Sequence, residues 1–365
     1  MNTSVNHTVQ HLHTLIADPL HVARLAAHGG SRVVAYLGND VPVALIAAAG
    51  AMPLRLRGVV GQETALADRY LESAYSPESR AVAEQWLRGE FDFIDAVVFP
   101  RTDDSAQRLY YYLCELQRRG LCAGPRPLLY DIANLARPMS AEYTRESTHR
   151  LARELGTLPA ALGQALSRLT RREALADQLR THRAASAPMA GSLAWAWERA
   201  SACDWREDFD SMSARWLEEA PRLSGPRRLL LAGDPSPDGA VHRAIENAGG
   251  SVVVDLTESL PDAPPAPSAS IDTVADHVRT RRSPVLAMRE NPDWIVDCAR
   301  GARADAVLFW LIEEDESMPW EIARQMRILE AAGMRTLLLS RQPWQADEAA
   351  LTRIREFVAA LKVAA

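Results

Sequence analysis

Residues 91–113 read F-D-F-I-D-A-V-V-F-P-R-T-D-D-S-A-Q-R-L-Y-Y-Y-L, and this stretch decides the fold. Residues 96–99 are a short apolar run typical of a buried strand, and the polar turn 100–104 leads into an amphipathic helix. In an open α/β sheet such a turn lies at the carboxyl edge, where ligands bind. The alternative is that Asp104 merely caps the helix, since aspartate is a preferred N-cap whatever the function, so both interpretations stay open. The first candidates for chemistry are Thr102, Asp103 and Asp104.

The composition is that of an ordinary globular protein. The chain has 365 residues, 47% hydrophobic and 24% charged, with a formal net charge of −6. This net charge gives no indication of nucleic-acid binding, and the basic residues of segment 168–183 have the spacing of a solvated helix face. No apolar run approaches the roughly 18 residues of a membrane span, and the amino terminus lacks a secretory signal pattern. We therefore expect a cytoplasmic protein that binds neither nucleic acid nor membrane.

The four cysteines are widely spaced. Cys114, Cys122, Cys203 and Cys298 form no C-x-x-C pair and no disulfide framework. Buried structural thiols are the simplest interpretation for Cys114 and Cys298, which lie on helical patterns.

A strand–helix rhythm organises the first third of the chain. Predicted helices at 6–28, 43–51, 62–73, 77–88 and 105–119 alternate with strands at 32–37, 54–57, 96–99 and 127–130. Such alternation predicts a mostly parallel sheet covered by helices on both faces. Continuous helical periodicity follows from about 140 to 218.

The same rhythm returns after the helical segment. Strands are predicted at 228–232, 251–255, 306–310 and 336–339, with helices at 240–248, 271–280, 292–302, 319–332 and 346–362. The expected fold is α/β, with two Rossmann-like parallel-sheet domains linked by a helical region. The expected boundaries are 1–139, 140–222 and 223–365. A cleft between the two units is the natural binding site.

No local motif specifies a reaction. The loop 233–239, G-D-P-S-P-D-G, lacks the lysine of a P-loop and the three-glycine dinucleotide pattern. There is no H-E-x-x-H, no G-x-S-x-G and no metal-type histidine pair. The acidic run 313–316 follows a buried strand, as Asp103 and Asp104 do. Two acidic turns facing one cleft either bind a cation or are solvated caps.

Taken in order, these segments resemble the subunits of 2-hydroxyacyl-CoA dehydratases and benzoyl-CoA reductases. The resemblance rests on G-N-D-V-P at 38–42 with A-A-G at 48–50, on P-L-R-L-R-G at 53–58, and on Y-S-P-E-S-R at 75–80 with D-A-V-V-F-P at 95–100. Segments 227–255 and 305–339 resemble the second domain of that family. The resemblance implies an α/β fold, an acyl-CoA ligand and a homologous partner subunit in a hetero- or homodimer.

The departures from the family pattern concern its iron–sulfur cluster. The three cysteine ligand positions fall on Ser76, on Asp103 and within residues 313–315, and none of them is cysteine here. Where the family has a serine in the opening turn, this chain has Asn39. Low-valent iron–sulfur centres need soft sulfur ligands, so we expect no cofactor in this chain and a cluster only in a partner subunit.

Three functions follow from this resemblance. The first is a cluster-less subunit that binds or acts on an acyl-CoA thioester with its partner. The second is a redox-free acyl-CoA lyase or hydratase that uses carboxylates in the former cluster site, and the third is an acyl-CoA-binding scaffold without activity. The candidate catalytic residues are Asp103, Asp104, Glu314 and Asn39. The candidate substrate-binding residues are Arg55, Arg57, Arg80 and Ser76, although salt bridging explains the arginines equally well. If Ser76, Asp103 and Glu314 meet in space, at least one carboxylate should have a raised pKa.

Overall fold

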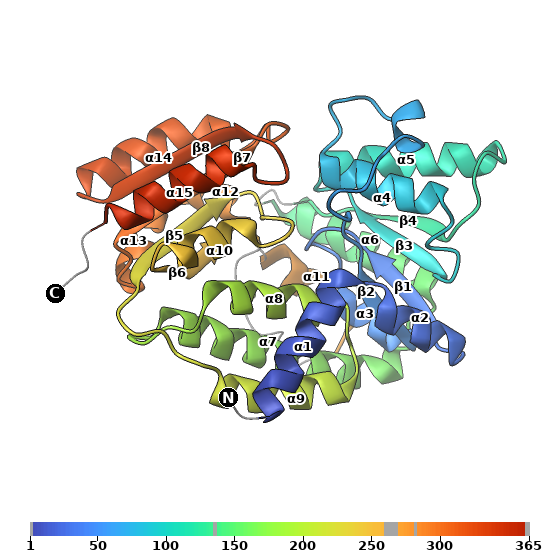
Figure 1. Ribbon diagram of the computed structural model, residues 1–365. Coiled ribbons are helices and arrows are strands. Elements are labelled where there is room, and N and C mark those ends of the chain that lie inside the picture. The colour runs from blue at the N-terminus through green and yellow to red at the C-terminus, as the bar shows by residue number, and fades with distance from the viewer. Residues whose placement is uncertain (1–2, 134–136, 259–268, 281–282, 362–365) are drawn as a thin grey trace.

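Two four-stranded parallel sheets form the framework of the protein (Figure 1). We describe a computed structural model that covers residues 3–133, 137–258, 269–280 and 283–361. The first sheet has the order β2-β1-β3-β4 and the second the order β6-β5-β7-β8. Their strands are β1 (Arg32–Tyr36), β2 (Ala51–Arg55), β3 (Ala96–Pro100), β4 (Arg126–Tyr130), β5 (Arg227–Gly233), β6 (Gly250–Leu256), β7 (Ala306–Ile312) and β8 (Arg335–Gln342). The predicted α/β fold with two Rossmann-like sheets is confirmed.

Helices cover both faces of each sheet because the strands are apolar on both sides. Every residue of β3 is buried, and so are residues 306–311 of β7. The helices and turn of the first lobe are α2 (His21–His28), α3 (Val43–Ala48), the 3-10 turn η1 (Ala67–Arg69), α4 (Pro77–Leu87) and α5 (Asp104–Arg118). The second lobe carries α10 (Ala240–Asn247), α12 (Pro284–Glu290), α13 (Trp294–Gly301), α14 (Pro319–Ala331) and α15 (Glu348–Ala359).

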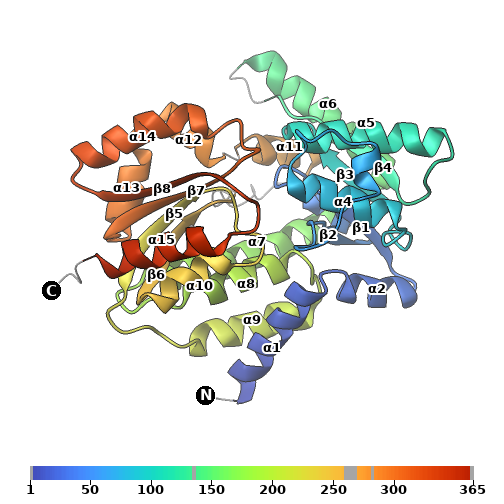
Figure 2. The ribbon, with the colours of Figure 1, turned by 45° about the horizontal axis from the view of Figure 1, so that its top comes forward.

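A helical layer joins the two lobes. It contains α6 (Pro138–Leu155), α7 (Pro159–Ala184), α8 (Gly191–Ser201) and α9 (Glu207–Glu219), and α1 (Thr3–Ala17) packs on α8 and α9. Figures 1 and 2 show α1 and α7 to α9 beneath both sheets. Helix α11 (Ile271–Thr280) follows β6 in sequence but packs on α6, and its Val274 and Val278 join the core of the first sheet. None of the described helices has a stretch long and apolar enough to cross a bilayer.

Three predicted elements differ from the structure. The single helix expected at 6–28 is two helices, α1 and α2, because Pro19 lacks an amide donor and Asp18 accepts from Leu20 N instead. The helix expected at 62–73 is only η1, since the buried Glu84 carboxylate accepts from the backbone amides of Leu66 and Ala67. The second strand runs over Ala51–Arg55 rather than 54–57, and this leaves Arg57 beyond the sheet.

Candidate functional site

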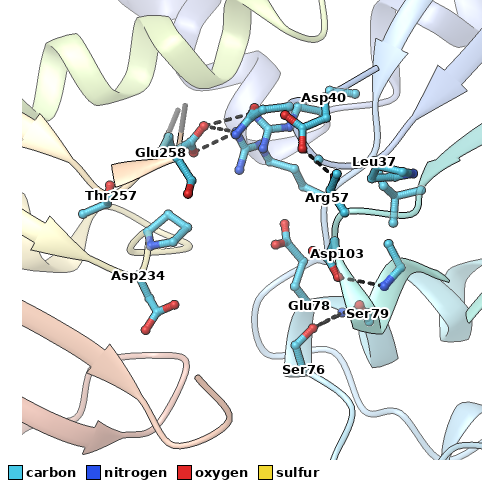
Figure 3. A pocket seen from close by; sticks show the side chains of 18 of the residues that line it. Leu37, Asp40, Arg57, Ser76, Glu78, Ser79, Asp103, Asp234, Thr257 and Glu258 are labelled. Atoms are coloured by element: carbon cyan, nitrogen blue, oxygen red, sulfur yellow. Dashed lines mark hydrogen bonds and ion pairs between the residues drawn. The ribbon is translucent and has the colours of Figure 1, made fainter. Parts of the chain in front are cut away.

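A cavity of about 450 Å³ lies between the two lobes, where the carboxyl ends of both sheets face each other. Both sheets have the same strand order, so corresponding turns meet across it. The turns after β1, β2, β3, β5 and β6 contribute lining residues (Figure 3), and so does Ile312 at the end of β7, as parallel α/β sheets bind ligands at this edge. The polar residues used below are Asn39, Arg55, Arg57, Ser76, Glu78, Asp103, Asp234, Thr257 and Glu258.

Two helices of the first lobe begin at the cavity. Ser76 caps α4, where its Oγ accepts from Ser79 N at 3.3 Å, and Asp103 caps α5, where its Oδ1 accepts from Ala106 N at 2.8 Å. Ser76 N also donates to Ser105 Oγ at 3.4 Å, and this contact joins the two helix starts. Helix amino termini carry partial positive charge, so both helices favour an anion in the cavity.

Asp103 is open to the cavity but closely surrounded by protein. This desolvation raises the pKa of Asp103, and the negative charges of Glu78 and Asp104 raise it further. The hydrogen bond from Ala106 N opposes the shift but does not cancel it. Asp103 is therefore a carboxyl group whose proton affinity is tuned by its surroundings.

Three arginines surround one glutamate, Glu258, which Figure 3 shows beside Arg57. Glu258 follows β6 and accepts from Arg55 Nη1 at 2.9 Å and from Arg57 Nη2 at 2.8 Å, and Arg199 Nη2 of α8 lies 3.8 Å from it. Burial alone raises the pKa of Glu258, but the charges of Arg57, Arg55 and Arg199 outweigh it and hold this pKa well below the usual range. We call Arg55, Arg57, Arg199 and Glu258 the arginine cluster.

The arginine cluster has more donors than its glutamate can accept. Within the described part of the chain, the Nε atoms of all three arginines are buried without a hydrogen-bond partner. Burial, and next the positive charge of Arg57, lower the pKa of Arg199 to about 10. Even with the negative charge of Glu78 nearby, positive charge is left over at the cavity wall.

Asp234 stands at the end of β5 in the second lobe. Gly233 before it has φ of 105°, and a Cβ there would lie 2.1 Å from the carbonyl oxygen of Trp310, so only glycine fits. This turn directs Asp234 to the cavity, where one carboxyl oxygen accepts from Ile312 N at 2.8 Å. Burial, then the charge of Asp315, and to a lesser extent Glu314, raise the pKa of Asp234 to about 7.

A second cavity of about 580 Å³ adjoins the first and shares Asn39, Thr257 and Glu258 with it. Its remaining lining combines apolar residues with the charged residues Arg180, Arg183, Glu198, Arg199 and Asp255. The apolar lining includes Trp195, Val253, Val254, Leu256, Trp294 and Cys298. The two cavities together suit a ligand with a charged and an apolar part.

The structure brings together some of the residues that the sequence predicted. Asn39, Arg55, Arg57, Ser76 and Asp103 all line the first cavity. The remaining three residues, Asp104, Arg80 and Glu314, do not line it.

These three residues have other surroundings. Asp104 is 81% exposed and lies 3.6 Å from Arg108, and Arg80 pairs with Asp68 on the first lobe. Glu314 contributes only its charge, by raising the pKa of Asp234. Glu314 does not join Ser76 and Asp103 in the lining of this cavity, and burial is the first cause of the raised pKa at both Asp103 and Asp234.

Sequence reasoning missed Asp234, Glu258, Glu78 and Arg199. Asp234 and Glu258 follow parallel strands directly, so the rule that pointed to Asp103 would have found them in the second lobe. Glu78 lies in the first turn of α4, two residues after Ser76. Arg199 lies inside a helix of the joining layer and has no local sequence signal.

The donor set of the cavity does not fit an iron–sulfur cluster. Its described lining contains no cysteine and no histidine, and only oxygen donors replace them. Cys298 lines the second cavity, and the other three cysteines line neither. Across the described residues, no group of three or more histidine, cysteine, aspartate or glutamate side chains is arranged to hold a metal ion.

Fold and site together define a two-lobed α/β protein with a polar cleft at the carboxyl edges of two matching sheets. A family model described as 2-hydroxyglutaryl-CoA dehydratase, D-component, matches residues 39–361. The match begins after β1 and covers strands β2 to β8 and most residues that line the cleft, and the chain belongs to this family. A search of curated proteins found no match.

Proposed function

We propose that this chain is a subunit of a 2-hydroxyacyl-CoA dehydratase or benzoyl-CoA reductase type complex, that it carries no cluster of its own, and that it binds an acyl-CoA thioester beside a homologous partner subunit. The observation that supports the proposal most is the arginine cluster at the carboxyl edge of the sheets. Its surplus positive charge suits the phosphates or the thioester oxygen of an acyl-CoA.

Two further features support an acyl-CoA ligand. The amino termini of α4 and α5 add partial positive charge from the opposite side of the cavity. The adjoining second cavity supplies apolar surface, including Trp195 and Trp294, for the uncharged part of the ligand. An amphipathic anion uses both, whereas a small inorganic anion would leave this apolar surface unexplained.

Titration calorimetry of the purified chain with butyryl-CoA tests the binding. The variants Arg57→Gln and Arg199→Gln should weaken binding by about tenfold or more, since about 1.4 kcal/mol of charge-assisted contact corresponds to that factor. Arg118→Gln is the matched control, because Arg118 lies on the exposed face of α5 and pairs only locally with Glu115. Equal affinity in all four proteins, or no binding at millimolar ligand, would overturn the proposal.

Iron analysis tests the expectation of a cluster in the partner alone. The chain is purified without air, both by itself and co-expressed with a homologous subunit that retains its cysteines. Iron and sulfide should appear only in the co-expressed pair, because the cavity offers oxygen donors where low-valent iron needs thiolates. A cluster in the chain purified by itself would contradict the proposal.

A second candidate function is redox-free chemistry by this chain itself. The observation in its favour is that Asp103 and Asp234 line one cavity and both have a raised pKa. Two carboxyl groups in one cavity can serve as the acid and the base of general acid–base catalysis. This candidate keeps the acyl-CoA ligand and differs only in where the chemistry takes place.

A further inference from the structure

Asp103 and Asp234 line the first cavity from opposite lobes. They come from corresponding edges of the two sheets, at the ends of β3 and β5, and Figure 3 shows them on opposite sides of the open space. Each has one carboxyl oxygen fixed by a backbone amide, Ala106 N for Asp103 and Ile312 N for Asp234. The two carboxyl groups therefore border one cavity from opposite lobes, each with one oxygen held by the backbone.

The chemistry open to two carboxyl groups depends on which proton must be removed. In a 2-hydroxyacyl thioester the proton lost in dehydration is at Cβ, which the thioester does not acidify, so that elimination needs an electron donor. In a 3-hydroxyacyl thioester the proton is at Cα, next to the carbonyl, and its removal gives an enolate. A carboxylate base and a carboxylic acid suffice for the second reaction and not for the first.

We propose that this cleft dehydrates a 3-hydroxyacyl thioester reversibly and without electron transfer, with Asp103 as the base and Asp234 as the acid. The inference rests on the proposed binding of an acyl-CoA in the cleft and names a substrate class for it. Asp103 takes the Cα proton, the electron pair forms the Cα–Cβ double bond, and the Cβ–O bond breaks. Asp234 gives its proton to the departing hydroxide, so the products are a 2-enoyl thioester and water. The reverse reaction restores both protons, and no oxidant or reductant is needed.

The surroundings of the two groups support this assignment of roles. Asp234 has the acidic neighbours Asp315 and Glu314, and a pKa of about 7 keeps a large fraction protonated near neutral pH. Asp103 lies on the side of the cavity where α4 and α5 begin, and their partial positive charge opposes, without cancelling, the rise in its pKa that burial causes. Arg57 lines the same cavity and supplies positive charge where the thioester oxygen becomes an enolate oxygen.

Hydration of crotonyl-CoA, followed by loss of the enoyl thioester absorbance, tests the inference on the purified chain and on the co-expressed pair. Asp103→Asn and Asp234→Asn should each lower the rate by about a hundredfold or more. Both variants keep an oxygen that accepts the backbone amide, so the fold is preserved. Glu115→Gln, an exposed carboxylate on α5 outside the cavity, is the control and should not change the rate.

Exchange of the Cα proton of 3-hydroxybutyryl-CoA in D₂O separates the two roles. Asp103→Asn should lose both exchange and dehydration, whereas Asp234→Asn should keep measurable exchange while losing dehydration. Activity that survives in both variants would come from another protein and would overturn the inference. Binding of crotonyl-CoA without hydration would overturn it too but leave the proposed acyl-CoA binding intact, while the absence of binding would remove both.

Discussion

The properties of Asp234 come from its neighbours and not from its residue type. Gly233 permits the turn that directs Asp234 to the cavity. Burial raises the pKa of Asp234, and the negative charges of Asp315 and Glu314 raise it further. The folded protein therefore holds a proton at Asp234 up to about pH 7, whereas the unfolded chain releases it near pH 4. Since the folded state binds more protons between these values, this group lowers the stability as the pH rises from about 4 through 7.

Asp234→Asn should remove this pH dependence. Asparagine is uncharged at every pH and still accepts from Ile312 N, so at pH 8 we expect the variant to be more stable than the wild type by about 2 kcal/mol. This figure lies below about 1.4 kcal/mol per pKa unit because the cavity is open to solvent. Urea unfolding at pH 4, 6 and 8 measures the difference, which should be small at pH 4. A difference that does not vary with pH would contradict the raised pKa.

At the scale of elements, the cavity is built from the starts of helices. Helix α5 begins where Asp103 accepts from Ala106 N, and α4 begins where Ser76 accepts from Ser79 N. The expectation that Asp104 caps this helix is wrong, because the cap is Asp103, whose side chain accepts from Ala106 N, and Asp104 is the first residue of the helix. Asp103 also lines the cavity, and its function there stays a prediction. A substitution at Asp103 can therefore change the stability, through the Oδ1 that accepts from Ala106 N, and the chemistry, through the carboxyl group that lines the cavity.

Two substitutions at Asp103 separate these effects. Asp103→Ala removes the acceptor for Ala106 N and should lower the free energy of unfolding by about 1 kcal/mol. Asp103→Asn keeps an acceptor of similar capping strength and should cost less than half as much. Urea unfolding at pH 7 compares them. Equal losses in both variants would show that the charge of Asp103, rather than its cap, determines the stability.

For the whole molecule, the arginine cluster ties three parts together. Arg55 and Arg57 belong to the first lobe, Arg199 to the helical layer and Glu258 to the second lobe. The low pKa of Glu258 keeps it ionised in the folded state, so its contribution is present at neutral pH. This contribution is lost only as the pH falls below about 4, toward the folded pKa.

Glu258→Gln should therefore leave three arginines without a balancing carboxylate. Removing one member of a buried ion pair costs roughly 3–5 kcal/mol, and for this partly exposed glutamate we expect about 2 kcal/mol at pH 7. Urea unfolding at pH 7 and pH 3 checks it, and the difference should shrink at pH 3. A variant as stable as the wild type at pH 7 would show that the arginine cluster does not hold the lobes together.

Local patterns were sufficient for most of the fold. Apolar runs such as residues 96–99 and helical spacing fix strands and helices whatever surrounds them, and the order of elements then favours two parallel sheets. The errors at 6–28 and 62–73 arose where one residue, Pro19 or the distant Glu84, decides the backbone hydrogen bonds. Local sequence is thus enough to predict that a helix or strand exists, whereas where it begins and ends depends on contacts with other residues.

The sequence by itself determined the two sheets, the turns at their carboxyl edges and the family resemblance, because these depend on residue order along the chain. It also indicated Ser76 and Asp103, which line the same cavity as the N-caps of α4 and α5. Only the tertiary structure decided that Asp234 and Asp103 line one cavity, that Arg199 and Glu258 join Arg55 and Arg57, and that Glu314 stays outside. These pairings join residues far apart in sequence, and their charges and pKa values depend on how the two lobes close, which no local pattern encodes.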